Sequence, residues 1–456
     1  MSVFLKTMWL ILISIAAVAC TTGVSGARTA PEPLDTRMEG VSAALLMGDA
    51  DQAIDAYEKA LADNPQNSTT KVLHARLLLL SLRLDEALAE IDAVLASEPN
   101  NADALLAKSL AVGLEGDTKT RKTLLERVVK LDSSNGEAWA SLGSVYLEER
   151  DYSRAGECFK KAQALDGETL VTVVGLGRVA YRQRKFKEAQ TYFDRAVELD
   201  PEYSFAYSDR ALVKRQLGDQ SGAMADLDAA IRLEPDYPYN YYDRGRILMG
   251  QDKWREAVAE FTLALDKDPD LFIAYVMRAG LNDDMGNVDR AISDYENVLR
   301  LRNNYYFAYA SLGALYWIKD QPDKAAGMFI KAFAADKRGR EYALLAALAL
   351  KKAGRAEEAV TYLREQLSAL PRGEWQYDMA QFIVAPERDY TAVNDANREK
   401  KKTLRGQILF YLAEQYLILE KKTLARTYFS EAAAIDQKGV IEKKLARYEL
   451  NRLAAP

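Results

Sequence analysis

Residues 189–201, AQTYFDRAVELDP, and residues 257–269, AVAEFTLALDKDP, share one spacing. An alanine is followed four places later by a phenylalanine, three places after that by a second alanine, and at the end by a proline. Steps of 34 residues from Pro65 to Pro371 find almost only residues that end helices or form turns. The same step finds the first alanine at every repeat except one, where Arg121 takes its place. A period of this length indicates a repeat architecture.

The spacing predicts two antiparallel helices in each repeat. The alanine lies where the two helices cross, because a larger side chain would force them apart. The phenylalanine fills the resulting layer, and proline stops the second helix. A second small residue recurs in the first half of the repeat, as at Gly177, Gly245 and Gly313. This pattern resembles the tetratricopeptide repeat, W-x2-L-G-x2-Y, then A-x3-F-x2-A, then P. The resemblance implies an all-α, right-handed α-solenoid, with ten contiguous repeats over residues 34–371.

The C-terminal part of the chain extends this array. Residues 372–405 interrupt the period but are rich in aromatic and apolar residues, so we expect short packed helices there. An eleventh repeat follows over residues 406–439, and its matching positions are Leu412, Ala413, Tyr416, Ala425, Phe429 and Ala432. Residues 440–456 predict an amphipathic helix that caps the last repeat. The expected fold is therefore about eleven helix pairs with a C-terminal capping helix.

Two aromatic stretches near the C-terminus carry a narrower resemblance. The segments 375–382 and 410–417 are similar to the C-terminal part of NlpI-type envelope lipoproteins. That resemblance implies an outer-membrane-anchored adaptor that gathers proteases and peptidoglycan hydrolases.

The first residues have the pattern of an export signal. Residues 1–19 contain Lys6, then a short apolar run, then small residues, and the run is too short to span a bilayer comfortably. Cys20 follows directly, which resembles the lipidated first residue of a mature bacterial lipoprotein, although Ala17 stands where leucine is usual. Residues 20–33 are small and polar, as a flexible tether should be. Conventional cleavage, which would release a soluble periplasmic protein, is the alternative.

Composition and charge exclude several classes of function. The formal net charge of −6, with both signs interspersed, argues against nucleic acid as a partner. The chain has two cysteines and one histidine, so no zinc-type cluster can be assembled, and we expect no metal or cofactor. We interpret His74 and Cys158 as packing residues.

The resemblance also implies a binding face. In tetratricopeptide proteins the first helix of each repeat lines a concave side, and four positions of that helix face the groove. In repeats five to nine, the residues that we assign to a partner-binding groove are Arg178, Tyr181, Phe205, Arg215, Tyr239, Tyr242, Arg246, Asp283, Phe307 and Trp317. Aromatic residues beside arginines are typical of interface hot spots. The alternative is that several of these side chains pack between repeats.

Repeats use almost all of the mature chain, and no nucleophile elbow, P-loop or metal-ligand set is present in the sequence. We therefore expect a non-enzymatic lipoprotein on the periplasmic face of the outer membrane. It would act as a scaffold that binds other envelope proteins or peptides through its concave groove. The alternative function is a ligand-binding accessory lipoprotein of a solute transport system.

Overall fold

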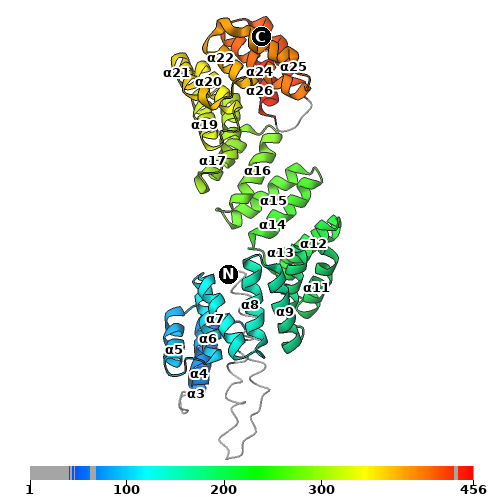
Figure 1. Ribbon diagram of the computed structural model, residues 1–456. Coiled ribbons are helices and arrows are strands. Elements are labelled where there is room, and N and C mark those ends of the chain that lie inside the picture. Colours follow the sequence, from blue (N-terminus) through cyan, green and yellow to red (C-terminus); the bar gives the residue numbers. More distant parts are fainter. Residues whose placement is uncertain (1–40, 42–43, 46, 62–67, 436–439, 455–456) are drawn as a thin grey trace, which may run out of the picture. The chain divides into compact units, whose positions relative to one another are not determined.

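The computed structural model describes residues 41–454 except 42–43, 46, 62–67 and 436–439 (Figure 1). Over these residues the chain is helical throughout and contains no strand. It divides into two compact units, one ending at Pro235 and the other beginning at Asp236. In the part of the chain so described, no helix combines the length and apolarity needed to cross a membrane. The predicted signal, its tether and Cys20 lie outside the described residues.

The N-terminal unit alternates the first and second helices of successive repeats, starting from the second helix of repeat one. Its helices are α3 (Ala50–Leu61), α4 (Ser68–Leu80), α5 (Leu84–Ser97), α6 (Ala102–Leu114), α7 (Thr118–Leu131), α8 (Gly136–Glu148), α9 (Tyr152–Asp166), α10 (Leu170–Arg182), α11 (Phe186–Leu199), α12 (Ser204–Gln216) and α13 (Gln220–Leu233). The two helices of each repeat pack on each other, and each second helix packs on the first helix of the next repeat. The unit is an α-solenoid.

The C-terminal unit continues the alternation. Its helices are α14 (Pro238–Gly250), α15 (Trp254–Lys267), α16 (Phe272–Asp284), α17 (Val288–Leu301), α18 (Tyr306–Ile318), α19 (Pro322–Ala335), α20 (Glu341–Lys352), α21 (Ala356–Gln366), α22 (Trp375–Val384), α23 (Asp389–Arg398), α24 (Lys402–Ile418), α25 (Lys422–Ala433) and α26 (Ile441–Ala454). The interruption of the period contains α22 and α23, which pack on each other and against α20, α21 and α24. The interruption is thus a short helix pair within the stack.

The contact that closes each repeat is the one that the spacing predicts. The crossing residue Ala257 and the ring of Phe261 are both fully buried. Gly245, on the first helix of the same repeat, lies directly against that ring, because a Cβ added there would stand 2.8 Å from Cε1 of Phe261. A Cβ on Gly313 would stand 2.6 Å from Phe329 in the same way. Side chains cannot approach so closely, so the small residue fixes how near the two helices lie.

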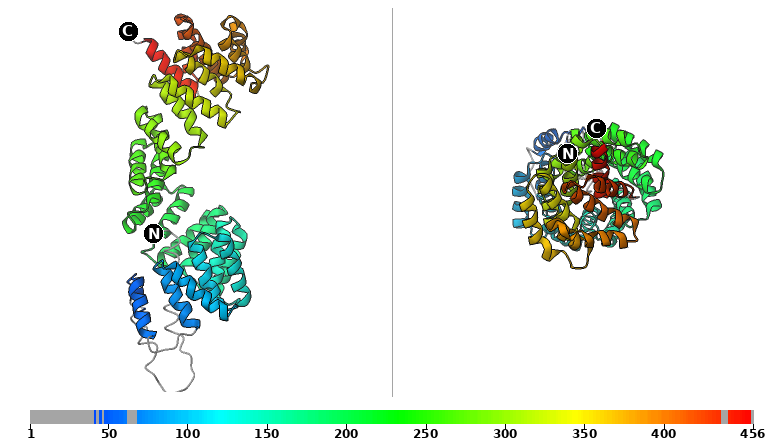
Figure 2. Two further views of the ribbon diagram at one scale, coloured as in Figure 1. Left: turned by 90° about the vertical axis from the view of Figure 1, so that its left-hand side faces the viewer. Right: turned by 90° about the horizontal axis from the view of Figure 1, so that it is seen from above.

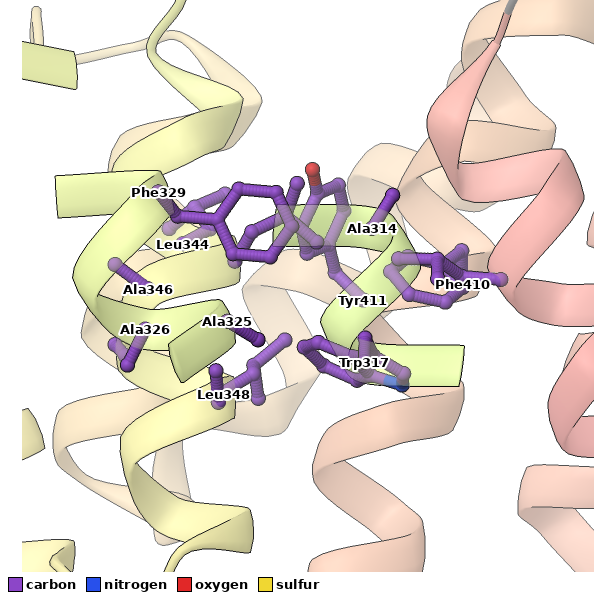
Figure 3. Close-up of a cluster of buried hydrophobic side chains, with 14 of the residues drawn as sticks. Ala314, Trp317, Ala325, Ala326, Phe329, Leu344, Ala346, Leu348, Phe410 and Tyr411 are labelled. Atoms are coloured by element: carbon purple, nitrogen blue, oxygen red, sulfur yellow. The ribbon is translucent and has the colours of Figure 1, made fainter. Parts of the chain in front are cut away.

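Apolar side chains continue this contact from repeat to repeat. In the C-terminal unit they form one large buried cluster that reaches from the eighth repeat to the last helices. Figure 3 shows part of it, in which Trp317 lies between Leu348 and Phe410. The ring centroids of Trp317 and Phe410 are 6.3 Å apart, although 93 residues separate them in the sequence.

Several repeats depart from the pattern at the leucine that precedes the small residue. Repeat nine has Leu312 there, whereas repeat eight has Arg278. The Arg278 guanidinium donates to both carboxylate oxygens of Asp294 on the second helix of the repeat, at 3.0 and 2.7 Å. It also reaches Thr262 of the preceding repeat at 2.9 Å. Asp294 is only 3% exposed, so the arginine compensates a carboxylate that would otherwise be buried without a countercharge.

Repeat six has the same arrangement. Arg210 Nη2 lies 2.8 Å from Asp226 and its Nη1 lies 2.9 Å from Asp194 of the preceding repeat. Each of these arginines therefore joins its own second helix to the neighbouring repeat. Where leucine is kept, as at Leu312, the residue sixteen places later is apolar (Met328). In repeats six, eight and nine the two positions vary together, whereas in repeat three Lys108 has Leu124 sixteen places later and pairs with Asp92 of the preceding repeat at 2.7 Å.

The single substitution Arg278→Leu should destabilise the protein, because it leaves Asp294 buried without its countercharge. We expect a loss of about 3 kcal/mol in the free energy of unfolding. The double substitution Arg278→Leu with Asp294→Met copies the apolar pair of repeat nine. It should return the stability to within about 1 kcal/mol of the wild type. Urea unfolding followed by circular dichroism measures both. A double variant as unstable as the single one would contradict this interpretation.

Candidate functional site: the concave faces of the two units

The first helices α8, α10 and α12 lie next to one another on the concave side of the N-terminal unit, where α10 packs on both neighbours. They surround a hollow of about 440 Å³. Its lining residues are Leu147, Glu148, Arg150, Tyr152, Arg178, Tyr181, Arg182, Phe193, Asp209 and Leu212. Arginine side chains outnumber carboxylates in this lining, and aromatic rings lie among them. The hollow therefore offers both charged hydrogen-bond donors and apolar surface.

Two of the residues that line the hollow, Arg178 and Asp209, form an ion pair. Arg178 Nε on α10 donates to Asp209 Oδ2 on α12 at 2.7 Å. The two side chains keep 30% and 20% of their surface exposed, so the pair is still open to solvent. Beside it, the ring of Tyr181 packs on Phe186 at a centroid distance of 5.7 Å, which holds the tyrosine in place. A partner would meet a site that is already ordered, which lowers the entropic cost of binding.

The ten residues predicted for the groove are divided between the two units. Arg178 and Tyr181 line the hollow, and Arg215 is partly exposed on α12. In the C-terminal unit Tyr239 and Phe307 are exposed aromatic residues, at 41% and 58%. These five side chains are accessible to a partner.

Three of the predicted residues need correction, since each is buried. Phe205 is 3% exposed and packs on the ring of Tyr203 at 5.6 Å. Tyr242 is 9% exposed and packs on Phe261 at 5.7 Å, while the Arg246 guanidinium lies over its outer side. Trp317 is 2% exposed. The repeat register gives the side of the helix on which a residue lies, but it does not show what covers that side.

Of the two remaining predicted residues, Arg246 is partly exposed and pairs with Asp243 at 3.3 Å. Asp283, like Trp317, contacts the C-terminal helix α26. The ammonium group of Lys444 on α26 forms an ion pair with Asp283 at the end of α16. Trp317 Nε1 on α18 donates to Glu449 of α26 at 2.9 Å. Figure 2 shows α26, in red, beside the green-yellow α18. The helix predicted to cap the last repeat therefore also occupies the concave positions of repeats eight and nine.

Two carboxylates are buried completely where α26 packs on the unit. Glu414 of α24 and Glu449 of α26 are both 0% exposed, and Lys352 of α20 contacts both. Arg452 adds a second positive charge, 2.8 Å from Glu449. Burial raises the pKa of Glu414 well above its ordinary value of 4.5, and the nearby Lys352 only partly offsets that rise.

Comparisons with known proteins agree with the helix pairs described above. A family model described as a tetratricopeptide repeat matches residues 44–110, and one described as the ETO1 C-terminal domain matches residues 107–308. The chain is a tetratricopeptide repeat protein. Proteins of this repeat class are interaction scaffolds that bind other proteins or peptides. The narrower similarity to NlpI-type lipoproteins stays a prediction.

Individual relatives of this tetratricopeptide repeat protein are distant. The BBSome complex member BBS4 of Bos taurus is 29% identical over 119 residues, which are 26% of this chain. The chain spans only 23% of the length of that curated relative. Among solved structures, pilF of Pseudomonas aeruginosa is 22% identical, with 44% of this chain and 92% of that chain covered and a TM-score of 0.39. The Cut9-Hcn1 structure of the APC/C is 17% identical, with 77% and 75% covered and a TM-score of 0.40.

Cys158 and His74 are side chains of this tetratricopeptide repeat protein that could act as a nucleophile or bind a metal, and each is held by contacts within the fold. Cys158 is 5% exposed, and burial raises the pKa of its thiol to about 11. A thiol with such a pKa stays protonated and is a poor nucleophile. His74 lies between Glu90 at 2.9 Å and Glu58 at 3.4 Å. Over the described residues, no group of three or more His, Cys, Asp and Glu side chains is placed to hold a metal ion.

The residues that sequence reasoning missed are Glu148, Arg150, Arg182 and Asp209 in the hollow and the glutamates of α26. Glu148, Arg150 and Arg182 lie at or just after the ends of first helices, whereas Asp209 lies in the middle of α12. Asp209 could have been found from the pairing of unlike charges about one repeat apart. Arg178 and Asp209 are 31 residues apart, close to one period. The sequence contains no such charge pairing for the surface on which α26 packs, because the contacts of α26 join segments up to 161 residues apart.

The pH dependence of stability should change when Glu414 is replaced by glutamine. Folding raises the pKa of Glu414, so its contribution to stability is present below its unfolded pKa and is lost as the pH rises. Between about pH 5 and about pH 8 the melting temperature of the wild type should therefore fall more steeply than that of Glu414→Gln. Glu357→Gln, at an exposed position of α21, should follow the wild type. Thermal unfolding across this pH range tests the expectation, and parallel curves for all three proteins would contradict it.

Proposed function

We propose that this protein is a non-enzymatic adaptor of the bacterial cell envelope, which is lipid-anchored through Cys20 and faces the periplasm from the outer membrane. It binds segments of other envelope proteins in the hollow of its N-terminal unit. The observation that carries the proposal is the hollow itself, in which Arg178, Tyr181 and Arg182 of α10 lie between two neighbouring first helices. The comparisons do not favour the alternative role in solute transport.

The chemistry of the hollow supports a peptide as its occupant. Arg150 and Arg182 are exposed at its edge, where they can pair with carboxylates of a bound segment. The Arg178–Asp209 pair is itself partly exposed to solvent. Tyr181 and Leu212 add the apolar surface on which a side chain of the partner can rest. Proteins with acidic and apolar residues in one exposed segment fit this surface best.

Tyr181 and Arg182 of α10 line the hollow without taking part in the Arg178–Asp209 ion pair, so their removal should weaken partner binding. We expect Tyr181→Ala with Arg182→Ala to lower the amount of protein that co-purifies from detergent-solubilised envelopes by at least about tenfold. The matched control is Lys187→Ala with Thr191→Ala, two exposed positions on the second helix of the same repeat. That control should retain its partners. Equal capture by all three proteins would show that the hollow is not the binding site.

The anchor is tested separately with Cys20→Ser. The wild type should incorporate a radiolabelled or clickable palmitate and fractionate with membranes, because two or three acyl chains give a stable membrane hold. The variant should lose the label and leave the membrane fraction. An unlabelled wild type that fractionates with soluble periplasmic proteins would show that conventional cleavage releases the chain.

A further inference from the structure

We infer that the concave face of the C-terminal unit is a second interaction surface, which α26 covers in the structure and which accepts a helix of the same chemistry from a partner protein. This surface is separate from the hollow of the N-terminal unit. The inference therefore does not depend on what the hollow binds.

We call the surface that contacts α26 through Asp283, Trp317, Lys352 and Tyr411 the seat. The seat binds particular side chains of α26. Glu442 and Glu449 are seven residues apart, so they lie two turns apart on one face of the helix. Glu442 is 3% exposed and accepts a hydrogen bond from the Tyr411 hydroxyl at 2.8 Å. Glu449 is fully buried and accepts from Trp317 Nε1 at 2.9 Å. Each glutamate thus meets an aromatic donor that belongs to the groove.

Apolar and basic side chains complete the match. Leu445 and Ala446 lie between the two glutamates and are both 0% exposed. Lys444 extends to Asp283 at the end of α16, and the ammonium group of Lys352 contacts Glu449 from the groove side. The seat consequently selects a helix with two glutamates two turns apart, a small apolar patch between them, and a lysine two places after the first glutamate.

These contacts give the seat its selectivity. A helix that lacked the glutamates would leave the Tyr411 hydroxyl and Trp317 Nε1 without these carboxylate acceptors, which costs about 1–3 kcal/mol for each group, and would leave Lys352 with Glu414 as its one carboxylate partner in this cluster. The seat uses side chains from first helices of four repeats, α16, α18, α20 and α24, and α26 packs in addition on α25, the second helix of the last repeat. A groove of this kind binds an amphipathic helix through its apolar face and reads polar anchors at fixed spacing.

Because α26 is part of the same chain, a partner helix must compete with it for the seat. A helix tethered by a short segment competes at an effective concentration in the millimolar range. A partner therefore binds only to the fraction of molecules from which α26 has left, and its apparent affinity falls by that fraction. A substitution that weakens the binding of α26 to the seat, but leaves the seat itself unchanged, should raise the affinity of the protein for a helix added in trans.

Lys444→Glu makes that change, because it sets two like charges together at Asp283 without altering the groove. The probe is a fluorescently labelled peptide with the unaltered sequence of residues 440–454, whose own lysine can still pair with Asp283. We expect this peptide to bind the full-length Lys444→Glu chain at least about tenfold more tightly than the wild type by fluorescence anisotropy. Lys444→Ala should give an intermediate value. The matched control Arg447→Glu alters an exposed position of the same helix and should behave as the wild type.

A second probe tests recognition itself. The same peptide with Glu442→Gln and Glu449→Gln should bind the Lys444→Glu chain at least about tenfold more weakly than the unaltered peptide. Hydrogen exchange of residues 441–454 in the Lys444→Glu chain reports independently whether α26 has left its seat.

Three results would overturn the inference. Faster exchange of α26 without peptide binding would show that the empty groove recognises no helix. Unchanged exchange in both Lys444 variants would show that α26 is a permanent part of the core. Dimers formed by exchange of α26, detected by light scattering, would make a second copy of this chain the occupant. Loss of envelope partners from the Tyr181 and Arg182 variant would bear only on the hollow, so the two proposals fail separately.

Discussion

The contact between a small residue of the first helix and an apolar ring of the second helix is the constraint on which the rest of this structure depends. At Gly313 and Gly245 the first helix lies closer to the rings of Phe329 and Phe261 than a residue with a Cβ would permit. A single pair held this way still exposes an apolar side, which only the next pair can cover. The contact therefore dictates a stack, and the stack grows by repetition instead of around one central core.

A stack of this kind leaves one side of every first helix unused. Within the N-terminal unit, that side forms the hollow around the Arg178–Asp209 pair. Within the C-terminal unit, α26 covers it through Glu442 and Glu449. The two concave faces thus have opposite states in the structure, one open and one occupied by the chain itself. Side chains on both faces also join one repeat to another, as the Arg178–Asp209 pair does in the N-terminal unit and Trp317 does in the C-terminal unit.

The sequence was most informative where one position repeats the same physical task. Ala257 and Phe261 could be placed in the core from spacing alone, since every repeat needs a small residue and a large apolar one at those positions. Trp317 was assigned to the groove by the same register, and it does lie on a first helix facing inward. Its burial could not be foreseen, because the residue that covers it, Glu449, is 132 positions away and belongs to no repeat. Periodicity predicts local neighbours, whereas it gives no information about a segment that folds back.

Arg278, which takes the place of the usual leucine, could be interpreted from the sequence only in part. A basic residue at an apolar position looks like a flaw in the repeat until Asp294, sixteen places later, is considered with it. Comparison with Leu312 and Met328 in the next repeat gives the rule from within the chain. The general inference is that departures from a repeat pattern should be read in pairs, at positions that the fold brings together.

The central claim is that the concave side of the N-terminal unit binds the partner. Site-specific photo-crosslinking in the native host tests this most directly, with a benzophenone amino acid placed at Tyr181 in the hollow or at Thr191 on the exposed second helix of the same repeat. The account predicts a discrete crosslinked protein from position 181 and none from position 191. Crosslinks from position 191 alone would place binding on the outer surface and contradict it.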